Sequence, residues 1–132
     1  GVSRACSHQL VRHRLCAFSQ ESQRYVRAEE FVWPDAGSQA EWRYQYYDAV
    51  AASFDAYEEL LASGVPKEDA RLVLPNAAMT RLVMSANFRQ WRHIIEVRCT
   101  PAAQWEIRAV CERIRDILTE HAPAVFGDLE GG

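Results

Sequence analysis

The residues from Gln9 to Tyr25 include the side chains that are best suited to bind an anionic ligand. This stretch holds three arginines, one histidine, two serines and three glutamines, and Glu21 is its only acidic residue. Guanidinium groups pair with phosphate or carboxylate through two parallel hydrogen bonds. Ser and Gln add neutral donors and acceptors that suit a ribose or a base edge. The stretch predicts a site for a nucleotide-like anion. The alternative is a basic, solvated helix end that runs into a loop.

A second group of candidate residues lies on a predicted helix further along the chain. Arg89 and His93 are four residues apart, which places them on the same helix face. Arg98 falls at the helix end, where the helix dipole favours a cation. The simpler interpretation is that Arg89 and Arg92 form a solvated face, with Glu96 as the partner of Arg92. His93 is then a hydrogen-bonded histidine of the core or its rim.

Arg71 is a third candidate, because it lies in the otherwise apolar segment 70–74. A buried guanidinium without a partner is costly. We therefore expect Arg71 to be paired with Asp69, with Glu68 or with an anionic ligand.

The composition is that of one ordinary globular domain with a core. The chain has 132 residues, of which 48% are hydrophobic and 25% charged. A net charge of −3 and the lack of a basic stripe argue against a nucleic-acid binder. Only Lys67 among the 15 basic residues is a lysine, a bias that reflects either codon usage or a preference for planar anion recognition. No apolar run reaches the length of a membrane span, so no membrane partner is expected.

The four cysteines and four histidines show none of the spacings that are typical of zinc sites, so no metal site is predicted. No segment resembles a signal peptide. Free thiols in a reducing cytoplasm are therefore the expected state of the cysteines.

The elements that must position these residues are mostly helices. A helix over about residues 2–11, with Ser3 as its N-cap, places residues 12–14 in or just beyond its last turn. Residues 15–22 show no clear period and predict an extended loop. The bulky aromatic residues of segment 25–33 predict a strand.

A turn at residues 34–37 and an N-cap at Ser38 predict a long helix to Ser63, ended by Gly64. The remaining elements are predicted as a short helix over 65–72, a strand over 78–86, a helix over 88–98, a helix over 103–121 and a frayed tail over 128–132. The total is an α+β fold that is mostly helical with a small sheet.

The spacing of Arg12-His13-Arg14, Ser22 and Gln23-Arg24-Tyr25 resembles the signature of the flavin-dependent thymidylate synthases, the ThyX family. Further segments resemble that family in the same order, and together they cover nearly the whole chain. They are Ala-Arg-Leu-Val-Leu-Pro at 70–75, Asn-Phe-Arg at 87–89 with His93 and Arg98 beyond it, and Ala-Gln-Trp-Glu-Ile-Arg at 103–108. The resemblance implies a single ThyX-like domain over residues 1–132.

The resemblance also implies an activity, the reductive methylation of dUMP to dTMP. It implies methylenetetrahydrofolate as carbon donor, FAD as the hydride-carrying cofactor, NADPH as reductant, and a homotetramer whose sites are shared between subunits. Direct hydride transfer to the uracil ring needs no enzyme nucleophile. Ser22, a nucleophile by residue type, is therefore assigned to nucleotide binding.

The resemblance implies roles for individual residues. Arg98 matches the arginine placed against the uracil, where a guanidinium stabilises negative charge on the ring, so it is the predicted catalytic residue. The predicted FAD-binding residues are Arg12, His13, Arg14, Gln20, Asn87, Phe88, Arg89 and His93. The predicted dUMP-binding residues are Gln9, Leu10, Val11, Arg12, Gln20, Glu21, Ser22, Gln23, Arg24, Arg71 and Arg98.

The chain departs from the family pattern at a few positions. Many members have Asn-Glu where this chain has Ser19-Gln20, and Gln20 cannot act as a base; some members have Asn at the position of His93. The chain begins at Gly1 without Met, and members are usually longer, so we expect an N-terminally incomplete domain. The alternatives are a truncated nucleotide- or flavin-binding module without turnover, and an interaction protein whose arginines are surface charge.

Overall fold

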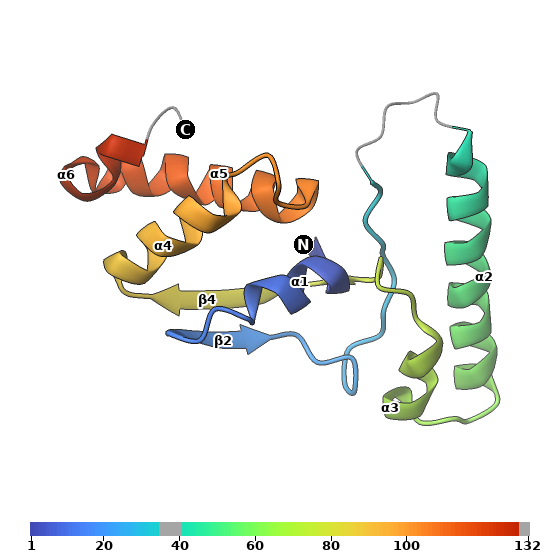
Figure 1. Cartoon of the computed structure of the whole chain (residues 1–132). Coiled ribbons are helices and arrows are strands. Elements are labelled where there is room, and N and C mark those ends of the chain that lie inside the picture. The colour runs from blue at the N-terminus through green and yellow to red at the C-terminus, as the bar shows by residue number, and fades with distance from the viewer. Residues whose placement is uncertain (35–40, 130–132) are drawn as a thin grey trace. The chain divides into compact units, whose positions relative to one another are not determined.

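The computed structural model describes residues 1–34 and 41–129 (Figure 1). The chain divides into two compact units, each made of two separate stretches. Unit 1 comprises Gly1–Ser7 and Gln20–Leu82, and unit 2 comprises His8–Ser19 and Val83–Gly132.

The elements follow in the order β1 (Val2–Ser3), α1 (Arg4–Leu10), β2 (Cys16–Gln20), α2 (Trp42–Ala62), α3 (Lys67–Ala70), the 3-10 helix η1 (Arg71–Val73), β3 (Met79–Thr80), β4 (Leu82–Ala86), α4 (Phe88–Arg98), α5 (Trp105–His121), α6 (Pro123–Phe126) and the 3-10 helix η2 (Gly127–Leu129).

Helices predominate in the described residues, and the strands form two small sheets. One sheet pairs β1 with β3 in antiparallel register, with Val2 opposite Thr80, and the other pairs β2 with β4. The predicted α+β fold, mostly helical with a small sheet, is confirmed. The prediction that residues 1–132 form one domain stays a prediction.

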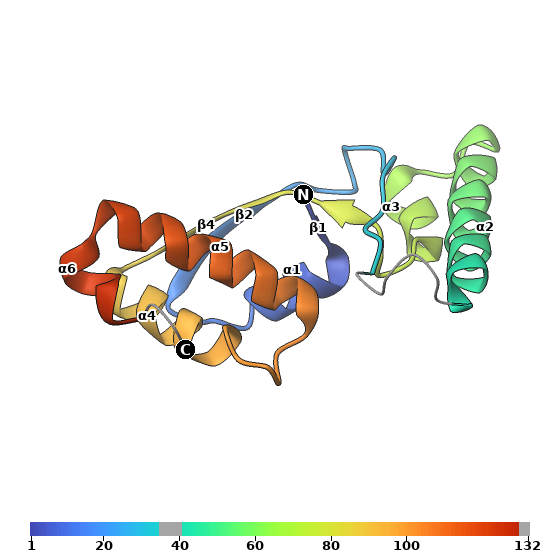
Figure 2. The ribbon, with the colours of Figure 1, turned by 90° about the horizontal axis from the view of Figure 1, so that it is seen from above.

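Unit 1 is built around the long helix α2, with α3 beside it (Figure 2). Gly64 follows the helix with a φ of 82°, a backbone conformation that glycine adopts without strain, and this confirms the predicted helix end. The core consists of the buried residues Ala28, Tyr57 and Ala70, against which Phe54, Leu60, Leu61, Val65 and Leu74 pack.

Unit 2 places helices against a two-stranded ribbon. In Figure 1, α4 and α5 lie on one side of β2 and β4, whose arrows run in opposite directions. Ile94 and Ile95 of α4 are buried, as are Ile107 and Cys111 of α5. Because α4 and α5 contact each other and these apolar residues are buried, the polar face of α4 is left for a site.

Two side-chain caps set where α4 and α5 begin. The Asn87 side-chain oxygen accepts a hydrogen bond from the Gln90 N–H at 2.9 Å. The Gln104 side-chain oxygen accepts from the N–H groups of Glu106 and Ile107 at 3.0 and 3.2 Å. These bonds satisfy N–H groups that lack partners within the helix. The helix predicted over 88–98 is confirmed at both ends, and α5 begins two residues later than predicted.

Two predicted elements are wrong. The extended loop predicted over 15–22 contains β2, whose residues alternate between half-buried and exposed because they pair with β4. The strand predicted over 25–33 makes only an isolated bridge between Phe31 and Ala78. The Phe31 ring lies instead 6.4 Å from that of Tyr47 and 6.0 Å from that of Phe54, so packing against α2 outweighs strand propensity.

The other predicted elements need smaller corrections. The first helix begins at Arg4, and the Ser3 side-chain oxygen caps it by accepting from the Cys6 N–H at 3.0 Å. The strand predicted over 78–86 is two strands separated by Arg81. Residues 128 and 129 of the predicted frayed tail belong to η2, which begins at Gly127. The predicted turn beyond Pro34, the predicted cap at Ser38 and residues 130–132 lie outside the described residues.

Arg92 of α4 is paired with Asp128 rather than with its predicted partner Glu96. Its two Nη atoms donate to the two carboxylate oxygens of Asp128 at 2.6 and 2.7 Å, and Nη1 also donates to the Val125 carbonyl. The hydrogen bond from Arg92 holds the pKa of Asp128 below its ordinary value. Arg92 therefore fastens the C-terminal residues of unit 2 to α4.

We expect Arg92→Ala to loosen these C-terminal residues, so that the amides of Val125 and Phe126 exchange hydrogen faster in exchange measurements. Arg115→Ala is a matched control, because within the described residues the Arg115 side chain donates its hydrogen bonds to the adjacent Asp116. Because folding lowers the pKa of Asp128, its contribution is present above its unfolded pKa and is lost as the pH falls through the folded value. Equal exchange in the wild type and Arg92→Ala would contradict the fastening role.

Candidate functional site

Arg98 and His13 form the centre of the candidate site in unit 2. Arg98 is the last residue of α4, and its Nε donates to Nε2 of His13 at 3.1 Å. Its Nη2 donates to the backbone carbonyl of Gln9 at 3.4 Å. The predicted catalytic residue is thus held by two of the predicted ligand-binding residues.

The imidazole of His13 is uncharged in this arrangement. Its side chain is buried, and its Nε2 must carry a lone pair because it accepts a hydrogen bond from a guanidinium. Burial, followed by the nearby charge of Arg98 and then His93, lowers the pKa of His13 from its ordinary value. The ring of His93 lies edge-on to that of His13, with 6.5 Å between the centroids. The predicted residues His13, His93 and Arg98 are therefore brought together.

We expect His13 to titrate below about 6.5, the ordinary value for histidine. Because the folded pKa lies below the unfolded one, the unfolded state binds more protons in this range. The free energy of unfolding should therefore fall as the pH drops from about 6.5 through the folded pKa of His13. Histidine NMR titration checks this, with the exposed His8 as reference in the same spectrum. A His13 midpoint at or above 6.5 would contradict the prediction.

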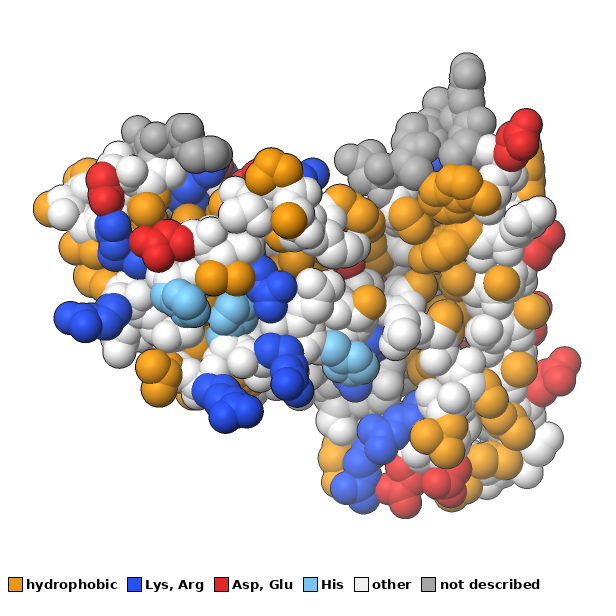
Figure 3. All heavy atoms as spheres, in the orientation of Figure 1, with side chains coloured by type: hydrophobic (Ala, Val, Ile, Leu, Met, Phe, Trp, Pro, Cys, Tyr) orange, Lys and Arg blue, Asp and Glu red, His pale blue; other side chains and the backbone are white. Residues whose placement is uncertain are grey.

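Exposed arginines surround this pair in the sequence and on α4. Arg12 and Arg14 flank His13, and Arg89 lies one turn before His93; all three are exposed. Among the described residues, none of these three arginines makes an ion pair within 4.0 Å. Figure 3 shows His and basic side chains gathered on this face of unit 2. Exposed guanidinium groups without carboxylate partners are suited to an anionic ligand.

Two further candidate residues line an open depression in unit 2. Arg14 and Asn87 both line it, together with Leu15, Cys16, Ala17, Ser85 and Ala86. Phe88, next to Asn87, is 52% exposed, and such a large exposed ring is suited to stacking on a planar ligand. Of the other predicted residues in unit 2, Leu10 is buried in the core and Val11 is exposed.

The predicted residues of unit 1 follow the end of β2, and several of them hold the fold. The Gln20 Nε2 donates to the side-chain oxygens of Ser7 and Thr80 at 3.1 and 3.2 Å. Only the side-chain carbonyl oxygen of Gln20 therefore remains to contact a ligand. Ser22 accepts from the Arg24 N–H at 3.3 Å and so shapes the turn that presents the Arg24 side chain.

Glu68 of α3 holds two predicted arginines. Arg24 contacts the Glu68 carboxylate through both Nε and Nη2 at 2.8 Å. Arg71 donates from Nε to the Glu68 backbone carbonyl at 3.0 Å. Arg71 is half-buried, and its bond goes to the Glu68 backbone carbonyl, whereas the expected partner was a carboxylate of Asp69 or Glu68 or an anionic ligand.

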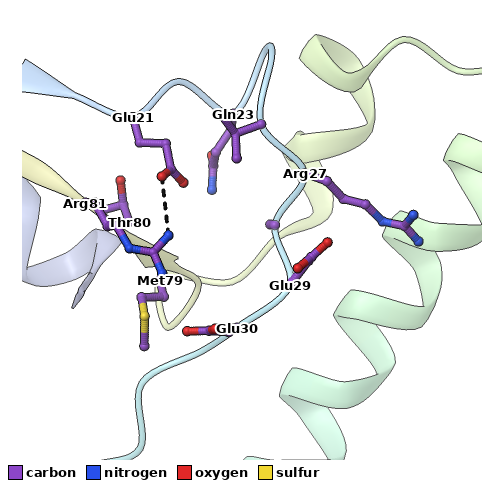
Figure 4. A pocket seen from close by; sticks show the side chains of 10 residues that line it. Glu21, Gln23, Arg27, Glu29, Glu30, Met79, Thr80 and Arg81 are labelled. Carbon is purple, nitrogen blue, oxygen red and sulfur yellow. Dashed lines mark hydrogen bonds and ion pairs between the residues drawn. The ribbon is translucent and has the colours of Figure 1, made fainter.

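A cavity of about 190 Å³ lies in unit 1 beside this segment (Figure 4). Glu21 and Arg81 point toward each other there, with 3.5 Å between their charged groups, whereas Arg27 points away to its partner Glu58 on α2. The Nε2 atom of Gln23 is buried without a hydrogen-bond partner in the described residues. Two predicted dUMP-binding residues, Glu21 and Gln23, therefore line one cavity.

Sequence analysis named Glu68 only as a possible partner of Arg71, and it identified none of the other residues that hold the predicted ones. Ser7, Thr80, Glu68 and Arg81 each bond a predicted residue of unit 1. Most of these partners are 44 to 60 positions away in the chain, so no local pattern could have indicated them. The predicted residues are brought together in two groups, one within each unit.

Residues 1–34 and 41–129 contain neither a cluster of metal ligands nor a membrane-spanning helix. No group of three or more His, Cys, Asp or Glu side chains is arranged there to hold a metal ion. None of the helices in this part of the chain combines the length and apolar character needed to cross a membrane.

Comparison with known proteins adds a family and several relatives. The model of the family described as "Thymidylate synthase complementing protein" matches residues 1–124. A flavin-dependent thymidylate synthase of Geobacter sulfurreducens is 47% identical over 137 residues, covering 100% of this chain and 59% of the relative. One of Mycobacterium tuberculosis is 38% identical, covering 98% and 59%. One of Pyrococcus furiosus is 39% identical, covering 91% and 52%. The chain thus spans little more than half the length of these relatives.

Proposed function

Because the chain belongs to the thymidylate synthase complementing protein family, we propose that the protein is a flavin-dependent thymidylate synthase. This membership confirms the resemblance that the motifs indicated. The proposed reaction is the reductive methylation of dUMP to dTMP, with methylenetetrahydrofolate as carbon donor and NADPH as reductant. The observation that carries the proposal is the Arg98–His13 pair together with the exposed Arg12, Arg14 and Arg89 of the same unit, which make no ion pair with the described residues.

The residues of unit 2 fit a flavin nucleotide. Its phosphates need cationic forks, which the exposed Arg12, Arg14 and Arg89 supply. Its planar ring needs an apolar or aromatic surface, which the exposed Phe88 supplies beside Asn87. Bound FAD would supply the hydride. His13 and His93 complete the set of residues proposed to hold it, together with the carbonyl oxygen of Gln20.

The residues around the end of β2 are proposed to hold dUMP. Arg24 supplies a guanidinium for the phosphate, and Arg71 supplies a second one. Ser22 and Gln23 offer a hydroxyl and an unpaired buried amide to the sugar or base. The other proposed dUMP-binding residues are Gln9, Leu10, Val11, Arg12, Gln20, Glu21 and Arg98.

Arg98 is proposed to act on the uracil ring. A guanidinium cannot give up its proton at working pH, so its role is to stabilise negative charge on the ring as it becomes a nucleophile. The proposal also includes a homotetramer with shared sites and a cytoplasmic location. The four cysteines are free thiols, as expected in a reducing compartment.

The first test is a visible absorption spectrum of the full-length protein with FAD, followed by a titration with dUMP. A protein-bound flavin spectrum that shifts when dUMP is added would support the binding of both ligands. Replacing Arg12, Arg14 and Arg89 together by alanine should abolish the bound spectrum, whereas the exposed Arg113→Ala on α5 should not. Bound flavin that dUMP does not perturb, without turnover, would favour a binding module. No bound flavin at all would contradict the proposal.

A further inference from the structure

The bond between Arg98 and His13 joins two residues that are each predicted to bind a ligand. Contact with a ligand alone does not explain why they bind each other. The guanidinium of Arg98 is half-buried, and its Nε and Nη2 are bonded to His13 and to the Gln9 carbonyl. Within the described residues these two bonds leave its other N–H donors for a ligand. Because the guanidinium is planar, two bonds on one edge determine where the remaining donors point.

We propose that His13 is a positioning residue, whose uncharged imidazole accepts from Arg98 and so orients the guanidinium toward the substrate. The inference rests on the proposed function, in which Arg98 acts on the uracil ring. In this arrangement the Nε2 atom of His13 is bonded to Arg98, and the Nδ1 edge of the imidazole remains for other contacts. A displacement of about 1 Å in a reacting group can lower a rate by about 100-fold, so such positioning has a measurable effect.

The arrangement depends on the charge state of His13. A protonated imidazole has N–H groups on both nitrogens, so Nε2 would no longer accept from Arg98. It would also place a second positive charge against the guanidinium. Protonation of His13 therefore releases Arg98 from its bond and repels it.

The charged groups around the pair decide whether this repulsion is offset. The titratable groups that act on His13 are Arg98 and His93, both on α4. From α5, the buried Cys111 lies near Arg98, and burial raises the pKa of its thiol to about 12, so it stays neutral. The described residues form no salt bridge with Arg98 or His13. The orientation of Arg98 should therefore be sensitive to acid.

The test compares His13→Ala with His13→Gln in the full-length protein. Gln keeps an acceptor for Arg98 and cannot be protonated, whereas Ala removes the acceptor. His8→Gln is the matched control, because His8 is exposed at the end of α1. For each variant, kcat is measured from pH 5 to 8. The side-chain Nε–H signal of Arg98 is followed by NMR with nitrogen-labelled arginine, and thermal unfolding checks that each variant folds.

We expect the wild-type kcat to fall on the acid side and the Arg98 Nε–H signal to disappear over the same range. His13→Ala should lower kcat by about 100-fold at all pH values and abolish the signal. His13→Gln should keep the signal and lose the acid dependence, and His8→Gln should behave as wild type. If His13→Ala keeps the wild-type kcat profile, or keeps the signal, the positioning role is wrong.

Failure of the proposed function gives a different result. The wild type would then show no turnover and no response of bound flavin to dUMP. The NMR comparison would still decide whether His13 orients Arg98, since it requires neither ligand. A signal that survives in His13→Ala would overturn the inference in that case as well.

Discussion

Replacing Arg98 by alanine is expected to lower kcat for dTMP formation by about 100- to 1,000-fold while flavin stays bound. This is the size of effect that follows the loss of one donor aimed at developing negative charge. Arg98 is the last residue of α4, at the opposite end of the helix from the Asn87 cap, so the fold should survive. The measurement is single-turnover oxidation of reduced flavin in the presence of dUMP and methylenetetrahydrofolate.

Arg113→Ala is the matched control for this substitution. Arg113 is an exposed arginine of α5 in the same unit, outside every predicted site. Its loss should leave both the flavin spectrum and kcat unchanged. Equal turnover in the wild type and Arg98→Ala would remove Arg98 from the catalytic role.

Replacing Arg24 by lysine is expected to weaken dUMP binding by about tenfold or more, although the positive charge is retained. Lysine cannot reproduce the two-pronged geometry of a guanidinium. The loss of one hydrogen bond to a charged group costs about 1.5–3 kcal/mol, and each 1.4 kcal/mol is a factor of ten in affinity. Calorimetric titration of the full-length protein with dUMP gives the change in Kd directly.

The stability of the protein should barely change in Arg24→Lys. The Arg24–Glu68 pair is half-exposed, with 52% and 47% of the side chains accessible, and such pairs contribute about 0–1 kcal/mol. Arg27→Lys is a matched control, because Arg27 makes a similar exposed pair with Glu58 in the same unit. If Arg27→Lys weakens dUMP binding as much as Arg24→Lys does, the effect is general and Arg24 has no specific role.

The elements that could be predicted from the sequence are those determined by local chemistry. The helix over 88–98 has its cap at Asn87, and the end of α2 has Gly64; both signals lie within one turn of the boundary that they set. Strand β2 escaped prediction because apolar and polar residues do not alternate in Cys16–Gln20, and β4, which pairs with it, lies over 60 residues away. The aromatic residues near Phe31 predicted a strand, but they pack on α2 instead.

The candidate site, too, could be predicted only where local sequence determines it. The motif with Arg12, His13 and Arg14 predicted an anionic, nucleotide-like ligand. The helix that carries Arg89 and His93 was predicted with the correct bounds. The bond between Arg98 and His13 could not be inferred, because 85 positions separate the two residues. Arg92 had a plausible local partner in Glu96, yet the more distant Asp128 offers both carboxylate oxygens to its fork.

The division of unit 2 into residues 8–19 and 83–132 has a consequence for how the protein folds. The Arg98–His13 bond closes a loop of 85 positions, so the chain must give up considerable entropy before this contact stabilises it. Contacts of such long range slow folding, whereas α4 and α5 are local hairpin partners that can associate early. We therefore expect the orientation of Arg98 to be acquired late in folding. During synthesis, His13 would therefore leave the ribosome before its partner Arg98 and would lack this bond until Arg98 has emerged.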